Sequence, residues 1–435
     1  MSGAGRAHDV MSVVPQISST ELRSLLERLS RLSLRGLAQM YDPRSRSFPH
    51  TVRGRSRDLH LVAEGLSVRY TAIATLGLSR MDEPARREVL AGQDLSALLP
   101  GVLGLALAGR DPGAIALSLW ATIEAGRALD GGMPEKDRVA RALDRLLTNI
   151  RTGVPVPTVD HAWTLVALLG AGSSDDLATS AGGHDQLLAV TQRAAQRLLA
   201  AQGPSGLFPH HLPARQTPRL RYHVSCFADQ VYPIQALARY AAFTGDLAAL
   251  DAAARCADRV VALQGERGQW WWHYDWRRGE VVEQYPVYSV HQHAMAPMAL
   301  LELDEAGGPD HRAAIAAGLA WLVKRPESAA DLIAEDLGVV WRKVGRHEPR
   351  KMVRTFRSAA SAADPGLRLT WLDWMFRPGP VDRECRPFEL GWLLYAWQAD
   401  DPLTSEMIEL EALAEAESAT GAPFSHSVPV AGERP

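Results

Sequence analysis

The sequence is poor in cysteine, with only Cys226, Cys256 and Cys385 among its 435 residues. They are odd in number and widely spaced, and none forms a Cys-x-x-Cys pair, so the sequence does not suggest a disulfide framework. The chain also lacks a run of 18 apolar residues that could span a bilayer. Its N-terminus lacks the apolar core of a secretory signal. These absences favour a reducing, cytoplasmic location.

An excess of charge of one sign is lacking too. The formal net charge is −3, so no overall attraction to nucleic acid or to an anionic membrane surface is expected. A hydrophobic content of 46% is ordinary for a globular core. We therefore expect no nucleic-acid partner and, with no long apolar run, no membrane span. The sequence also gives no sign of a cofactor, and the expected partner is a small-molecule or glycan substrate on grounds given below.

What the chain has in abundance is helical periodicity. Apolar helices begin near Ser67, Asp111, Asp160, Asp229, His291 and Phe388, and amphipathic helices lie at 18–40, 83–91, 135–150, 186–201, 247–263, 310–323 and 404–417. A helix that is apolar on all sides is buried, and an amphipathic helix covers it. The pattern therefore predicts an all-α fold, an (α/α)6 toroid. Strands are hard to find, although Val281 and Val282 could form a short ribbon in the loop 264–290.

No linker divides the helical part of the chain. We expect a single toroid domain over residues 17–418, with a long insertion at 324–387. The polar, small segments 1–16 and 419–435 are expected to be disordered.

An internal repeat supports the toroid. Residues 197–208 align without gaps with residues 259–270. In the second copy Gln264, Gly268 and Trp270 form a Gln-x3-Gly-x-Trp unit, which resembles the QW motif of squalene and terpene cyclases. The resemblance implies a toroid in which the glutamine caps a helix end and the tryptophan stacks on the next repeat. The DxDD and DDxxD acids of those cyclases are absent.

The overall plan also resembles the six-hairpin carbohydrate enzymes. Six hairpins lead to a mouth rich in Trp, His and carboxylates, and residues 232–246 read like the turn between an inner and an outer helix. The family includes glycoside hydrolases, unsaturated-glucuronyl hydrolases, N-acylglucosamine 2-epimerase and glucuronyl C5-epimerases. The resemblance implies a hydrolase, lyase or epimerase that acts on a sugar or glycan, which could be acidic.

Candidate catalytic groups gather where inner helices begin and in the aromatic loop 264–290. Histidine and carboxylates transfer protons near neutral pH. The candidates are Asp229, His273, Asp275, Glu283, Tyr285 and His291. His291 and His293 are two residues apart and do not form the i, i+4 pair of a helical zinc site, so no metal site is predicted.

Candidate substrate-binding residues share the same mouth or belong to the basic insertion. Aromatic rings can stack on a sugar, and arginine forks match carboxylates and phosphates. The candidates are Arg69, Tyr70, Asp160, His161, His223, Gln230, Trp271, Trp272, His293, Trp341, Arg342, Lys343 and Glu389. Some of these, Asp160 among them, could equally cap helices.

Three functions remain open from the sequence. The first is a carbohydrate-active enzyme with acid–base catalysis in an aromatic mouth. The second is a terpene-cyclase-like enzyme that protonates a prenyl substrate in an aromatic cavity. The third is a non-catalytic toroid that serves as a binding scaffold.

Overall fold

The computed structural model describes residues 17–55, 60–129, 134–348, 352–363, 369 and 371–397. The expected helix at 404–417 and the terminal segments 1–16 and 419–435 lie outside this range. No described helix is long and apolar enough to cross a membrane.

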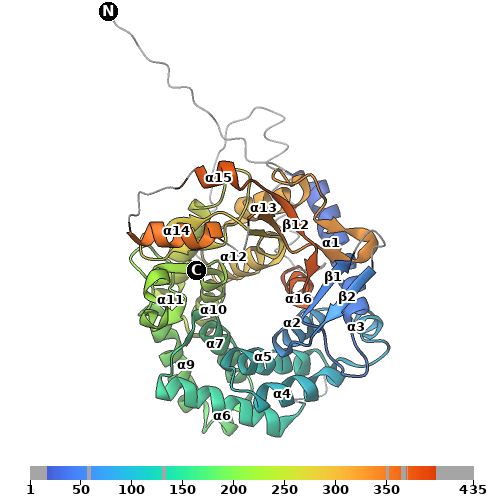
Figure 1. Ribbon diagram of the computed structural model, residues 1–435. Helices are drawn as coiled ribbons and strands as arrows, with labels where there is room; N and C mark the ends of the chain where they lie inside the picture. Colours follow the sequence, from blue (N-terminus) through green and yellow to red (C-terminus); the bar gives the residue numbers. More distant parts are fainter. Residues whose placement is uncertain are drawn as a thin grey trace, which may run out of the picture.

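Among the described residues, six helices form a closed inner ring (Figure 1): α2 (Val68–Ser79), α5 (Pro112–Ala128), α7 (Thr158–Gly172), α10 (Ala228–Thr244), α12 (Ala296–Glu305) and α16 (Pro387–Ala396). Each packs against the next, and α16 closes the ring on α2. A Cβ added to Gly77 would lie 2.3 Å from the carbonyl oxygen of Gly391. Glycine at this seam therefore lets the first and last inner helices touch through their backbones.

An outer layer covers this ring (Figure 1): α1 (Ser19–Met40), α4 (Leu99–Ala108), α6 (Lys136–Thr152), α9 (His184–Leu199), α11 (Leu247–Ala262) and α13 (Arg312–Lys324). Shorter helices are α3 (Glu83–Val89) and α8 (Asp175–Ser180). Leucines recur along one face of α1 and are buried, as the periodicity predicts. The predicted all-α (α/α)6 toroid is confirmed.

One outer position is filled differently from the expectation. Residues 83–91 do form a helix, α3, but it packs against α1. The layer outside α2 and α5 is instead α4, which also contacts α6. The sequence did not reveal α4 because Leu99–Ala108 is almost entirely apolar and contains Gly101 and Gly104. It therefore shows no amphipathic stripe.

Short strands occupy the loops that lead into the inner helices. They form five small antiparallel sheets: β1 (Thr51–Arg55) with β2 (His60–Glu64) and β13 (Glu384–Cys385); β3 (Val156–Pro157) with β4 (His211–Leu212); β5 (Val224–Cys226) with β6 (His273–Asp275) and β7 (Glu280–Glu283); β8 (Val287–Tyr288) with β11 (Lys343–Arg346) and β12 (Pro378–Asp382); and β9 (Ile333–Ala334) with β10 (Val339–Val340). The expected ribbon at Val281-Val282 is β7. The other strands were missed because two to five residues are too few to show an alternating pattern.

The 62-residue repeat has the same contacts in both copies. Each glutamine amide donates to the carbonyl of the glycine in its own unit at 2.8 Å. It also donates to a carbonyl of the following outer helix, at 2.7 Å from Gln202 and 2.9 Å from Gln264. Phe208 and Trp270 are fully buried. The repeat thus joins consecutive hairpins through these contacts.

Irregular segments complete the end of the ring where inner helices begin. A π-helical turn, His291–Met295, leads into α12, and 3-10 turns at Ala214–Gln216, Arg219–Arg221 and Glu335–Leu337 lie in the loops that enter inner helices. A further 3-10 turn, Leu95–Leu98, leads into outer helix α4. The insertion adds α14 (Met352–Ala363) and α15 (Trp371–Met375). Helix α14 packs on β7 and on the turn Arg219–Arg221, so it lies over the entrances to α10 and α12.

Candidate functional site

The two ends of the inner ring differ in chemistry. A cavity of about 530 Å³ opens where the inner helices end, and its lining includes Arg80, Arg239, Glu302 and Tyr395. Its central charges satisfy each other, because Arg239 donates to both carboxylate oxygens of Glu302, at 2.5 and 2.9 Å. Buried polar atoms without a hydrogen-bond partner among the described residues, such as Asp229 Oδ1 and His273 Nδ1, lie where the inner helices begin, and we call this end the mouth.

The first group at the mouth joins three consecutive inner helices. Arg69 in α2 donates to both oxygens of Asp160 in α7, at 2.8 and 2.9 Å. It also donates to Asp111, the N-cap residue of α5, with its Nε at 2.7 Å. A Cβ on Gly113 would lie 2.3 Å from Asp160. The start of α5 therefore needs glycine so that this ion pair can fit.

Asp160 lies 3% exposed, and burial raises the pKa of its carboxyl. The charge of Arg69 opposes that rise, whereas the negative charges of Asp111 and Asp229 reinforce it. Asp160 and Asp229, on the neighbouring helices α7 and α10, are thus within electrostatic reach of each other.

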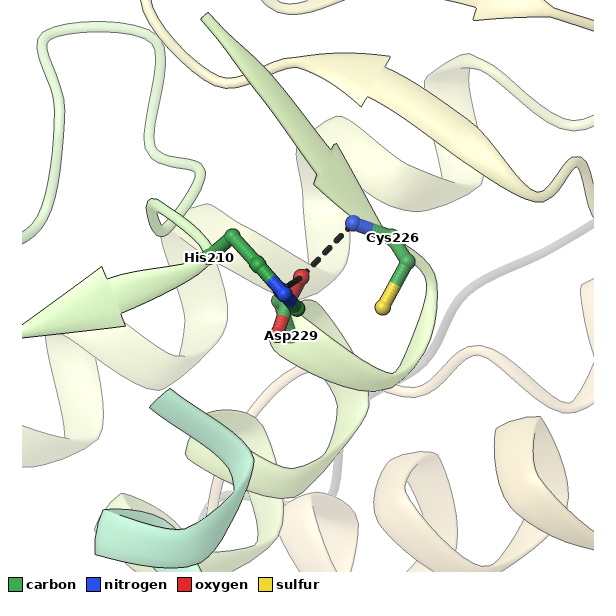
Figure 2. Close-up of side chains that lie close together, drawn as sticks. All are labelled: His210, Cys226 and Asp229. Atoms are coloured by element: carbon green, nitrogen blue, oxygen red, sulfur yellow. Dashed lines mark hydrogen bonds and ion pairs between the residues drawn. The ribbon is translucent and has the colours of Figure 1, made fainter. Parts of the chain in front are cut away.

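The second group is centred on Asp229 in the first turn of α10 (Figure 2). Its Oδ2 lies 2.9 Å from Nδ1 of His210 and accepts the backbone N–H of Cys226 at 2.7 Å. Asp229 is fully buried, and its Oδ1 has no hydrogen-bond partner among the described residues. The charge of Asp229 raises the pKa of His210. The imidazole is 44% exposed, so it connects the buried carboxylate to the mouth.

A cationic rim lies beside this dyad, and we define it as Arg221 and Arg354. The guanidinium of Arg354 stacks 4.1 Å from the ring centre of Trp272. Neither rim guanidinium has a hydrogen bond or ion pair to a described residue. Burial lowers the pKa of His273, and both guanidiniums lower it further; Arg221 also acts to lower the pKa of His210. The rim thus places positive charge next to the Asp229–His210 dyad.

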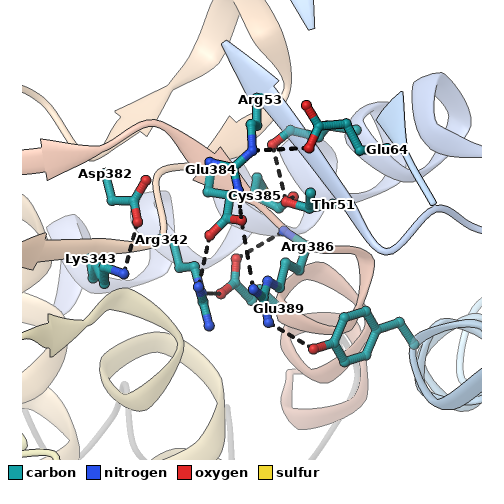
Figure 3. Close-up of polar contacts among 12 residues, drawn as sticks. Thr51, Arg53, Glu64, Arg342, Lys343, Asp382, Glu384, Cys385, Arg386 and Glu389 are labelled. Atoms are coloured by element: carbon teal, nitrogen blue, oxygen red, sulfur yellow. Dashed lines mark hydrogen bonds and ion pairs between the residues drawn. The ribbon is translucent and has the colours of Figure 1, made fainter. Parts of the chain in front are cut away.

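A third group joins the insertion to α16 and α2 (Figure 3). Arg342 donates to Glu384 at 2.7 Å and lies 3.4 Å from Glu389. Arg386 donates to the hydroxyl of Tyr70 at 2.8 Å. Glu389 is 1% exposed, and burial raises its pKa to about 7. Glu389 also accepts the backbone N–H of Arg386, so it caps α16.

Three of the predicted catalytic residues support the loop around β6 and β7. Asp275 accepts the backbone N–H groups of Arg277 and Arg278, at 3.0 and 3.3 Å, and so shapes the hairpin turn. Glu283 is buried against Arg346 at 3.0 Å and accepts the backbone N–H of Tyr285 at 3.1 Å. The ring of Tyr285 lies under the guanidinium of Arg346. Asp275, Glu283 and Tyr285 thus each stabilise the conformation of this loop.

The predicted histidines are buried, and burial lowers the pKa of each. His161 pairs with the carbonyl of Ala194 in outer helix α9 at 2.9 Å, so it points out of the ring. His223 pairs with Ser361 of α14 at 2.8 Å. His291 stacks on Phe227, and His293 lies fully buried. The pKa falls to about 4 for His161 and to about 3 for His291 and His293.

Most of the remaining predicted residues make structural contacts, and Trp272 lies partly exposed at the mouth. Gln230 binds the backbone of Phe208 through both its amide oxygen and its nitrogen. Trp271 and Trp341 are buried, Lys343 pairs with Asp382 at 2.8 Å, and Trp272 is partly exposed beside His273. Of the predicted catalytic residues, Asp229 belongs to the dyad, and His273 lies within electrostatic reach of His210 and both rim arginines.

The sequence did not single out His210, Arg221 or Arg354 as candidate site residues. His210 occupies the loop that enters α10, directly after the first repeat copy. The adjacent pair His210 and His211 could have indicated a site residue, because the loops that enter inner helices line the mouth. Arg221 and Arg354 could not be separated from the other arginines, since which of them lacks a carboxylate partner depends on the fold.

No protein-family model matches the chain, and no curated protein gives a significant match. Solved structures do resemble it. An unsaturated glucuronyl hydrolase specific for heparin has a TM-score of 0.54 and 12% identity, covering 90% of this chain and 97% of its own. An unsaturated glucuronyl hydrolase from Bacillus sp. GL1, responsible for degradation of glycosaminoglycan, has a TM-score of 0.55 and 13% identity, covering 86% and 95%.

A wild-type glycosidase has a TM-score of 0.53 and 13% identity, covering 91% of this chain and 99% of its own. These matches extend over nearly the whole of each structure, so the chain has the six-hairpin α/α toroid fold of these glycosidases. At such low identity the likeness concerns the fold, and function must be argued from the site.

Proposed function

We propose that the chain is a carbohydrate-active enzyme, a glycoside hydrolase that removes an acidic sugar from the end of a glycan. The observation that carries the proposal is the Asp229–His210 dyad at the mouth, with Asp160 on the next inner helix. Hydrolysis needs one group that gives a proton to the leaving oxygen and another that takes one from water. A buried carboxylate, a half-exposed imidazole and a second carboxylate supply such groups.

In the proposed reaction the bond between the anomeric carbon and the leaving oxygen breaks. Water forms the new bond to that carbon, one proton goes to the leaving oxygen, and one proton leaves the water. His210 is the group that the substrate can reach, and Asp229 orients it through Nδ1. Asp160 is the second carboxylate, and the bidentate contact with Arg69 holds it in place.

The acidic character of the substrate follows from the cationic rim. Arg221 and Arg354 place two guanidiniums next to the dyad, and no described carboxylate neutralises them by an ion pair. An arginine fork matches the carboxylate of a uronate, and the ring of Trp272, stacked between Arg354 and His273, holds the Arg354 guanidinium in position. A uronate at the rim would bring its glycosidic bond close to His210.

The test compares uronate-ended disaccharides, saturated and unsaturated, with neutral disaccharides of the same linkage. The expected result is release of the uronate with a new reducing end, and little turnover of the neutral compounds. Arg221→Met should raise KM for the uronate substrate about tenfold or more, since one charge-assisted contact contributes about 1.5–3 kcal/mol. Arg219→Met, on the same turn and exposed, is the matched control and should leave KM unchanged. Turnover of neutral glycans alone would refute the acidic-sugar assignment.

A further inference from the structure

Three different metal-binding side chains meet at the entrance to α10 (Figure 2). One nitrogen of His210, the Sγ of Cys226 and one oxygen of Asp229 all lie within 4.8 Å of one another. They come from three separate places: the loop before β4, the last residue of β5 and the first turn of α10. The fold, rather than a local motif, brings these donors together.

A second observation points to a ligand at the same place. Asp229 is fully buried, yet its Oδ1 has no hydrogen-bond partner among the described residues. A buried charged oxygen without a partner is costly, and a bound cation would remove that cost. Oδ2 accepts the backbone N–H of Cys226 at 2.7 Å, so the carboxylate is held in position next to the thiol.

From this arrangement we propose that His210, Cys226 and Asp229 bind a divalent ion of the zinc type. A thiolate, an imidazole and a carboxylate are the ligands that Zn²⁺ and Co²⁺ accept, whereas Mg²⁺ and Ca²⁺ prefer oxygen alone. The thiolate and the carboxylate together carry two negative charges, which the ion balances. Three protein ligands leave a fourth position for water or a substrate group, and His210 and Cys226 are both partly exposed, so the site is accessible from solvent.

The ion and the proposed hydrolysis compete for the same atoms. Coordination uses lone pairs of Asp229 and His210 that the dyad needs for orientation and proton transfer. Bound zinc therefore inhibits the enzyme, and this consequence rests on the proposed function. The binding itself does not, because it can be measured without any substrate.

Co²⁺ is the probe, added to the full-length protein in a buffer free of thiols. A thiolate ligand gives a sulfur-to-cobalt charge-transfer band in the near ultraviolet, and a tetrahedral site gives visible d–d bands. Wild-type protein should show both bands at one equivalent of Co²⁺, and one equivalent of Zn²⁺ should abolish them. Cys256→Ser and Cys385→Ser, which alter the other two cysteines, should keep both bands.

Cys226→Ser should lose the charge-transfer band, and His210→Gln should weaken Co²⁺ binding at least tenfold, with helical circular dichroism unchanged in both. His210→Gln is the second variant because its side chain is half-exposed and tolerates change. Absence of the band in wild type, or its persistence in Cys226→Ser, would overturn the inference. If wild-type protein turns over the uronate substrate but shows no charge-transfer band with Co²⁺, the metal site is refuted and the proposed function stands.

Discussion

Arg69 holds both carboxylate oxygens of Asp160, with Nη1 to Oδ1 at 2.8 Å and Nη2 to Oδ2 at 2.9 Å. The pair links the first and third inner helices across the start of the second. The side chain of Asp160 is 4% exposed and that of Arg69 30%. The contact therefore fixes one carboxylate of the proposed reaction and also joins three hairpins.

Gly113→Ala should disturb this pair directly, because the new Cβ would lie 2.3 Å from Asp160 Oδ1 and 2.6 Å from Arg69 Nη2. We expect a loss of about 1–3 kcal/mol in unfolding free energy and a fall in turnover of about 100-fold. Chemical denaturation and a steady-state assay measure the two effects. Gly101→Ala is the matched control, since a Cβ there meets nothing within 4 Å. Equal behaviour of the two variants would contradict the role given to Gly113.

Glu389 should make the fold less stable as pH rises. Burial raises its pKa from 4.5 to about 7, so the folded state holds a proton that the unfolded state releases. The unfolding free energy should therefore fall between about pH 4.5 and 7, by at most about 3 kcal/mol. Glu389→Gln should remove this dependence in denaturation curves recorded across that range.

Glu384 gives the opposite pH dependence and serves as the comparison for Glu389. Burial acts to raise the pKa of its carboxyl, but Arg342, Arg386 and Arg53 outweigh burial and lower it. Its stabilising effect is present above the ordinary glutamate pKa and is lost as pH falls through the lowered value. Glu384→Gln should therefore weaken the fold at neutral pH, and it should reduce the Glu389 effect without removing it, because burial, the largest cause of the raised Glu389 pKa, remains. If the unfolding free energies of Glu389→Gln and Glu384→Gln depend on pH in the same way, the opposite pKa shifts assigned to the two carboxyls are wrong.

The two repeat glutamines should matter for stability and not for turnover. Gln202→Ala and Gln264→Ala each remove two amide-to-carbonyl contacts between hairpins. We expect a loss of about 1–3 kcal/mol for each, with similar size at the two positions. Gln192→Ala, an exposed change on α9, is the control. A large loss of turnover at unchanged stability would argue that the repeat takes part in the chemistry.

The architecture could be predicted from the sequence because helical periodicity is local. The inner helices are largely apolar all round, apart from polar residues near their ends, so Trp120 or Leu168 signals burial without knowledge of any neighbour. The same reasoning fails for α4, whose glycines and apolar residues give no stripe. It also fails for strands of two residues, which owe their pairing to the loops.

The site was harder to predict because its members converge from distant segments. Asp275 lies between Tyr274 and Trp276 in the sequence, an aromatic setting that made it a candidate catalytic acid. In the structure its carboxylate accepts two backbone N–H groups of a turn. His210 has few aromatic neighbours in sequence, yet the fold places it against Asp229. Which carboxylate pairs with an arginine and which with a histidine depends on contacts that spacing does not encode.

The most direct test of the account compares Asp229→Asn with Asp275→Asn on the uronate substrate. The first change should lower kcat by about 100-fold to 10,000-fold with the fold intact, because it removes the charge that orients His210. The second should reduce stability and keep kcat within about tenfold of wild type, since Asp275 shapes a turn. The reverse order, with Asp229→Asn active and Asp275→Asn inactive while folded, would contradict the site proposed for this toroid.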